Sequence, residues 1–182
     1  MKKIHAWLAA ILMAAGLGLL APGSASAASY CGLVWGSLEE SNQTMSTASV
    51  SNVRTGQHYC FDRLVIDLKG KAQGYNVRYV SKVVQDGSGL PITMRGSAFL
   101  QITANSPSYD NVTGKATFIP ANRSEVTNVS GYQTFRQVAW AGSFEGYTSL
   151  GLGVRARLPF QVFTLAGPGT GSRLVIDVAH YW

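Results

Sequence analysis

Apolar and polar residues alternate in short runs along the chain after residue 50, with glycine and polar turn residues between the runs. Runs rich in branched apolar and aromatic residues predict strands. We expect strands at residues 50–53, 61–68, 75–84, 98–104, 138–140, 149–152, 160–165 and 173–179. No window repeats apolar residues with a period of 3.6, so the pattern predicts an all-β sandwich or barrel with little helix.

The segments between these runs have distinct compositions. Residues 37–40 (SLEE) have the spacing of a capping box, which predicts a helical turn there, and residues 41–49 predict a loop. Residues 86–89 (DGSG) predict a tight turn. Residues 105–131 are rich in Asn, Ser, Gly and Thr, so we expect a long connection with one short strand near Phe118.

One five-residue segment occurs twice. The RLVID of residues 63–67 recurs at residues 173–177. Branched apolar residues on both faces of a strand suit burial on both sides, which predicts that both copies are central strands. The Arg and Asp of each copy are expected to bond or pair at the strand ends.

The first residues have the layout of a secretory signal. A cationic start at residues 1–3 is followed by an apolar run at 4–21 and by the small-x-small site Ala25-Ser26-Ala27. The alternative is a retained membrane anchor, but the run is shorter than the ~20 residues that span a bilayer. We therefore predict a signal peptide at 1–27, an N-terminal arm at 28–49 and a secreted β domain at 50–182. After cleavage no stable membrane insertion is expected.

The predicted export affects two inferences, one from the net charge and one from the two cysteines. Loss of Lys2 and Lys3 with the signal lowers the formal net charge from +6 to +4, and the remaining cations are scattered, so no nucleic acid partner is expected. The two cysteines, Cys31 and Cys60, are predicted to form a disulfide that ties the arm to the domain. Two free thiols, or a metal site with His58, are the alternatives.

Six blocks in order resemble the AMIN-like domain of actinobacterial exported proteins, which is related to the AMIN domain. They are CFDRLVIDL (60–68), GYNVRYV (74–80), DGSG (86–89), GSFEG (142–146), GLGVRARLPFQVFTL (151–165) and RLVIDVAH (173–180). The resemblance covers roughly residues 50–182. It implies a small two-sheet β-sandwich that belongs to an exported protein of the cell envelope. AMIN domains attach amidases and secretion or pilus components to the wall or to partners. The resemblance therefore implies a non-catalytic module that binds cell-wall polymer (peptidoglycan or an associated glycan) or an envelope protein.

The residues offer little for catalysis. After the predicted cleavage site the imidazoles are His58 and His180, neither lies near a G-x-S-x-G elbow, and no zinc or phosphate-loop motif is present. We expect no metal and no cofactor. Glycoside hydrolysis needs two carboxylates, and Glu145 within GSFEG is the acid of most interest because glycines flank its segment. A secreted hydrolase acting on an envelope glycan through Glu145 and a second acid is one alternative function; Glu145 as a turn residue is the other interpretation.

Aromatic side chains and arginines are the better candidates for ligand binding. Aromatic rings stack on the apolar faces of sugars. Arg155 and Arg157 are expected to alternate along one strand and to point to the same face, toward wall carboxylates or phosphates or over the sheet edge. The candidate ligand-binding residues are Glu145, Arg155, Arg157, Trp140, Tyr75 and Tyr79. Ordinary packing of these aromatics is the competing interpretation, and protein binding by edge-strand addition is a further alternative function.

Overall fold

The computed structural model describes residues 31–32 and 34–182, and these residues form strands without any helix. The strands are β1 (Glu40–Asn42), β2 (Ser49–Gln57), β3 (Phe61–Lys69), β4 (Tyr75–Val80), β5 (Val83–Val84), β6 (Pro91–Ile92), β7 (Ala98–Ala104), β8 (Phe135–Phe144), β9 (Tyr147–Val154), β10 (Phe160–Ala166) and β11 (Ser172–Ala179). The all-β prediction is confirmed. The predicted signal peptide and its cleavage after Ala27 lie outside the described residues.

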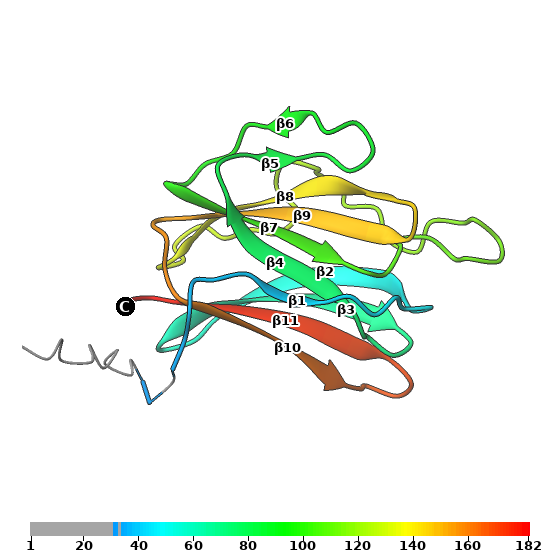
Figure 1. The fold of residues 1–182 in the computed structure, drawn as a ribbon, viewed down its shortest axis with the longest axis horizontal. Coiled ribbons are helices and arrows are strands. Elements are labelled where there is room, and N and C mark those ends of the chain that lie inside the picture. The colour runs from blue at the N-terminus through cyan, green and yellow to red at the C-terminus, as the bar shows by residue number, and fades with distance from the viewer. Residues whose placement is uncertain (1–30, 33) are drawn as a thin grey trace, which may run out of the picture.

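Two antiparallel sheets face each other across one core. A five-stranded sheet has the order β1-β4-β7-β9-β8, and a four-stranded sheet has the order β10-β11-β3-β2 (Figure 1). Inward side chains such as Leu64 and Ile176 meet Leu100 and Leu152 of the opposite sheet in a single buried cluster. The predicted sandwich of two sheets is therefore confirmed.

The hairpin β5–β6 forms a third layer on the outer face of the five-stranded sheet (Figure 1). Gln101 of β7 holds it by bonding both the amide and the carbonyl of Val84, at 3.2 and 3.3 Å. The strand predicted at 75–84 is thus broken after Val80, because Val83 turns onto this outer face and is buried there.

Glycines of β9 allow this layer to approach closely. A Cβ added at Gly151 would lie 2.5 Å from Met94 Sδ, and one at Gly153 would clash with the Arg95 carbonyl oxygen. Leu150 and Leu152 alternate with these glycines and point into the core instead. The G-L-G pattern therefore fills one face of β9 and leaves the other face flat.

The repeated RLVID segments lie in β3 and β11, which are adjacent central strands of the four-stranded sheet. Their antiparallel register sets Arg63 opposite Asp177, and the Arg63 Nε–Asp177 Oδ1 distance is 2.6 Å. Asp67 pairs with Arg54 of β2 at 2.8 Å, while Arg173 donates to the Ala166 carbonyl at 3.0 Å. The prediction of central strands is confirmed.

The N-terminal arm crosses from one sheet to the other. The predicted disulfide joins Cys31 to Cys60, with Cα atoms 6.3 Å apart. Gly36 then forms a bridge with Phe160 of β10, and the Glu40 carboxylate accepts the Val162 amide at 3.1 Å. The helical turn predicted at 37–40 is wrong, because pairing with the edges of both sheets outweighs the local capping preference.

Candidate ligand groove

A groove of about 480 Å³ lies between the β5–β6 hairpin, strand β8 and the long connection before β8. Its walls combine aromatic rings with polar side chains that include one carboxylate and one guanidinium. The residues that define its chemistry are Phe118, Trp140, Phe144, Gln85, Asp86 and Arg123.

The connection over 105–131 forms one wall because it runs along the edge of β8. The Trp140 amide donates to the Arg123 carbonyl at 2.7 Å, and the Val126 amide donates to the Val138 carbonyl at 2.8 Å. The strand predicted near Phe118 does not form, and Phe118 instead packs on Trp140 with ring centroids 5.6 Å apart. Pairing of the connection with β8 thereby places aromatic side chains from both segments in one wall.

A bulge in β8 shapes the groove beside these rings. The register with β9 shifts between Trp140 and Gly142, and Gly142 has a φ of +126°. A Cβ added at Gly142 would lie 3.2 Å from the Asp86 Cβ, so glycine lets the hairpin turn approach. The bulge is followed by Phe144, which is 52% exposed. Among the aromatic rings that line the groove, Phe144 is the one most open to a ligand.

Asp86 is the carboxylate of the groove wall. Its amide donates to the Ala141 carbonyl at 2.8 Å, and its Oδ2 is buried without a hydrogen-bond partner. Burial raises the pKa of Asp86 above its ordinary value, and hydrogen bonds from Ser149 offset part of the rise. Because this oxygen is shielded from solvent and has no donor, burial outweighs the Ser149 hydrogen bonds in setting the pKa of Asp86.

A family model for the AMIN-like domain matches residues 48–180. The chain belongs to the AMIN-like domain family. No curated protein and no solved structure matches it. Membership makes this AMIN-like chain an envelope-related module, and its disulfide agrees with a location outside the cytoplasm.

The predicted ligand-binding residues of this AMIN-like domain do not form one site. Trp140 lines the groove, whereas Glu145 is the first residue of the turn between β8 and β9, with a φ of +48°. Glu145 follows Phe144 but does not line the groove. The remaining candidates lie away from the groove, where the Arg157 guanidinium is 4.9 Å from the centre of the Tyr79 ring.

Arg155 and Arg157 follow β9 rather than belonging to it. The prediction that they alternate along one strand is wrong, because β9 ends at Val154 and the chain bends there. Arg155 donates to the His180 carbonyl, and Arg157 donates to the Ser37 carbonyl at 2.9 Å. Each guanidinium therefore connects segments that are distant in sequence.

The two tyrosines of β4 contribute to packing. The Tyr79 hydroxyl donates to the Leu158 carbonyl at 2.7 Å and accepts the Leu158 amide at 3.0 Å. Burial raises the pKa of Tyr79 to about 12. The Tyr75 ring packs against the core, and burial, followed by the nearby Glu40 charge, raises the pKa of Tyr75.

The two histidines lie in different environments. His58 stacks on Phe61, with ring centroids 4.6 Å apart. The buried His180 Nε2 lies 3.1 Å from Asp62 Oδ1, while Asp62 Oδ2 accepts the Thr134 and Phe135 amides at 2.6 and 3.0 Å. This buried pair fastens the start of β8 to β3 and is closed to a substrate.

The described part of the chain holds neither a metal-binding cluster nor a membrane-spanning helix. Residues 31–32 and 34–182 contain no group of three or more His, Cys, Asp or Glu placed to hold a metal ion. The same residues include no helix with the length and apolar character needed to cross a bilayer. The groove joins three aromatic rings to polar groups, and a second hollow of about 470 Å³ joins Tyr132 and Phe135 to Arg95 and Glu125.

Sequence reasoning missed Phe118, Phe144 and Arg123 as lining residues of the groove. Phe118 and Arg123 lie in the polar connection, which carries no strand pattern of its own. The GSFEG block did draw attention to the right hairpin, although its phenylalanine lines the groove and its glutamate occupies the turn.

Proposed function

We propose that this AMIN-like protein is a secreted, non-catalytic binding module that holds a glycan segment of the cell-wall polymer in the groove. The observation that carries the proposal is the arrangement of Phe118, Trp140 and Phe144 beside Gln85 and Arg123. Sugar rings pack their apolar faces on aromatic side chains, while amide and guanidinium groups bind the hydroxyls. Such a site holds a sugar chain without needing a reactive group.

The carboxylates of the groove support binding over hydrolysis. Glycoside hydrolysis by the common mechanisms uses two carboxyl groups on opposite sides of the scissile bond. Asp86 is the one carboxylate among the described lining residues, and Glu145 lies outside the lining. A ligand in the groove would therefore meet a single acid, which suits hydrogen bonding to a donor on the sugar.

Sedimentation with purified, insoluble cell wall tests the proposal. Phe144→Ala removes the exposed stacking surface and is expected to weaken wall binding by about fivefold. Arg123→Gln, which removes the guanidinium that lines the groove, is expected to weaken it as well. Val112→Ala is the matched control, because Val112 is exposed and does not line the groove.

Three results would contradict the proposal, and two of them would point to another function. Absence of sedimentation with wall at every salt concentration overturns it. Turnover of a glycan that disappears in Asp86→Asn or in Glu145→Gln replaces binding by hydrolysis. Saturable binding to one envelope protein, without affinity for wall, makes the chain a protein-interaction domain, for which the exposed end of β10 at Thr164–Ala166 is an available edge.

A further inference from the structure

Exposed aromatic and apolar side chains gather at the end of the molecule where the described chain begins and ends. Tyr59 is 91% exposed and Trp182 is 64% exposed, both unusually high for large rings. We call this surface the terminal patch. It comprises Val34, Leu38, Tyr59, Tyr181 and Trp182, with Arg155 and Arg157 between them.

Two contacts hold the beginning and the end of the described residues together at this end of the molecule. The disulfide fixes Cys31 to Cys60, the residue after Tyr59. The Cys60 carbonyl accepts the His180 amide at 2.9 Å, so Tyr181 continues from the same point. The patch is therefore assembled from three separate segments by a covalent bond and a backbone hydrogen bond.

The arginines connect the remaining members. Trp182 Nε1 donates to the Arg157 carbonyl at 3.0 Å, and the Arg157 side chain donates to the carbonyl of Ser37, the neighbour of Leu38. The Arg155 guanidinium lies 5.3 Å from the centre of the Tyr181 ring. Among the described residues neither arginine forms a salt bridge, and the Arg157 guanidinium also lies 4.9 Å from the centre of the Tyr79 ring.

We propose that the terminal patch rests on the surface of an anionic lipid bilayer. Tyrosine and tryptophan concentrate at membrane–water interfaces, where their rings suit the mixed environment. Arginines close to such a surface attract anionic headgroups. Rings and cations are combined here on one exposed end of the molecule, so the chemistry of the patch matches that of an interfacial surface.

The path of the chain supports a bilayer as the occupant. The apolar run at 4–21 precedes the domain, and the chain enters the domain at Cys31, inside the terminal patch. Residues 22–31 span at most about 35 Å when extended. The predicted signal peptide would thus keep the terminal patch within this distance of the membrane during export.

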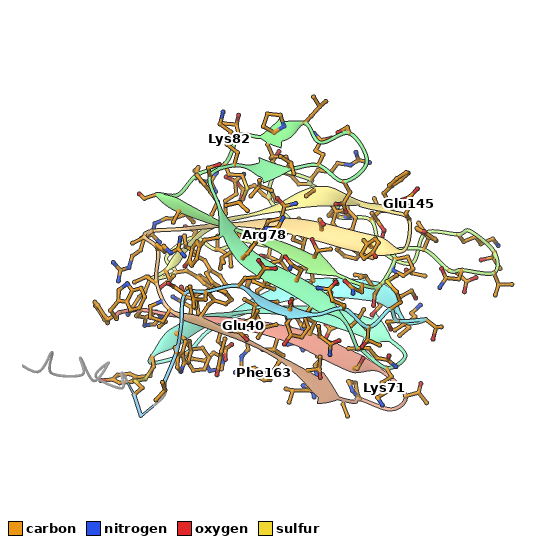
Figure 2. All side chains as sticks on the ribbon, viewed as in Figure 1. Glu40, Lys71, Arg78, Lys82, Glu145 and Phe163 are labelled. Atoms are coloured by element: carbon orange, nitrogen blue, oxygen red, sulfur yellow. A yellow bond between two sulfur atoms is a disulfide. The ribbon has the colours of Figure 1, made fainter. Side chains whose placement is uncertain are left out.

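The groove lies away from this surface. The C-terminus lies on the left of the view, and Glu145, adjacent to the groove residue Phe144, lies toward the upper right (Figures 1 and 2). A domain resting on its terminal patch keeps the hairpin tip pointed away from the bilayer. The bilayer proposal does not depend on what the groove binds.

Vesicle flotation tests the proposal with the exported protein, whose N-terminus is first determined by mass spectrometry. Vesicles of equal parts phosphatidylcholine and phosphatidylglycerol are compared with vesicles of phosphatidylcholine alone. The protein is expected to float with the anionic vesicles and to show a blue shift of tryptophan emission. Tyr59→Ser/Tyr181→Ser/Trp182→Ser is expected to lower the partition coefficient by at least about tenfold. Arg157→Gln is expected to lower it by about fivefold at low salt.

The matched control is Leu90→Ser/Val112→Ser, which removes exposed apolar side chains elsewhere and is expected to bind as the parent does. Circular dichroism and thermal melting identify any variant that is not folded. No flotation of the parent with anionic vesicles overturns the proposal. Equal losses in the triple variant and the control also overturn it, as does equal binding to both vesicle compositions. Capture of one envelope protein by the patch without vesicle binding overturns it in favour of a protein partner.

Discussion

Two ion pairs on the outer face of the four-stranded sheet differ in how far their carboxylates are buried. The Asp177 side chain is fully buried, whereas that of Asp67 is 22% exposed. Arg63 also lies against the rings of Phe61 and Phe163, at 5.1 and 5.4 Å from their centres. A carboxylate without access to water depends on its partner much more than a hydrated one does.

Substitution of the two arginines should therefore have unequal effects. Arg63→Met leaves Asp177 buried without its cation and is expected to lower the free energy of unfolding by about 3 kcal/mol. Arg54→Met, the matched control, is expected to cost less than about 1 kcal/mol because Asp67 remains hydrated. Urea unfolding at neutral pH measures both values, and equal losses would contradict the assignment.

Asp86 predicts a pH dependence of stability. Its pKa is raised in the folded state, so the folded state holds the proton more tightly than the unfolded state does. The stabilisation of the folded state by protonated Asp86 is fully present below the ordinary pKa of the carboxyl group. It is lost as the pH rises through the raised pKa. Asp86→Asn is therefore expected to melt higher than the parent above this window, with the difference shrinking toward acid pH.

Asp110 provides a control of opposite sign. Hydrogen bonds from the Thr113 amide and hydroxyl, and from the Val112 amide, lower the pKa of Asp110. Its stabilising contribution is present above the ordinary pKa and is lost as the pH falls through the lowered value. Asp110→Asn should thus melt lower than the parent at neutral pH. Thermal melts across the acid range measure both variants, and pH-independent differences would contradict the assignment.

At the scale of elements, the β5–β6 hairpin lies on a β9 face that glycine keeps flat. Gly153→Ala would push a methyl group into the Arg95 carbonyl, so backbone must move and about 3 kcal/mol of stability is expected to be lost. Gly56→Ala is the matched strand control, because an added Cβ has no neighbour closer than 3.9 Å. Denaturant unfolding compares the two, and similar values would show that the layers can separate freely.

The arm is an element whose position depends on the disulfide. Cys31→Ser removes a cross-link with a sequence separation of 29, and loop entropy predicts a loss of about 3–4 kcal/mol. Faster hydrogen exchange at the Val162 amide is also expected, since Glu40 of the arm accepts that proton. Cys31→Ser/Cys60→Ser should match the single variant, and unchanged exchange would mean that β1 holds the arm alone.

At the scale of the whole molecule, the two proposed surfaces should bind independently. The groove and the terminal patch share no residue, and Glu145, next to the groove residue Phe144, lies across the molecule from the C-terminus (Figures 1 and 2). Substitutions that are far apart act separately in most proteins. Phe144→Ala should leave vesicle partition unchanged, and the triple patch variant should leave wall sedimentation unchanged. A loss of both activities in either variant would contradict independence.

The sequence by itself determined the fold class, the central RLVID strands and, by way of the predicted export, the disulfide. Local alternation of side chains specifies strands, and apolar residues on both faces of a strand specify a central position. The six ordered blocks also indicated the family, through their resemblance to the AMIN-like domain. These are properties of neighbouring residues along one chain.

Only the tertiary structure decided where ligand-facing side chains gather. Trp140 and the core residue Val138 are on the same face of β8, but Val138 is buried and Trp140 is only partly buried. The connection that carries Phe118 and Arg123 packs beside Trp140 and leaves a groove there. Arg155 and Arg157 likewise lie beyond the end of β9 at Val154, where they bond the carbonyls of His180 and Ser37. The positions of these side chains depend on which distant segment packs against the edge of a strand. The local alternation of apolar and polar residues carries no information about that segment.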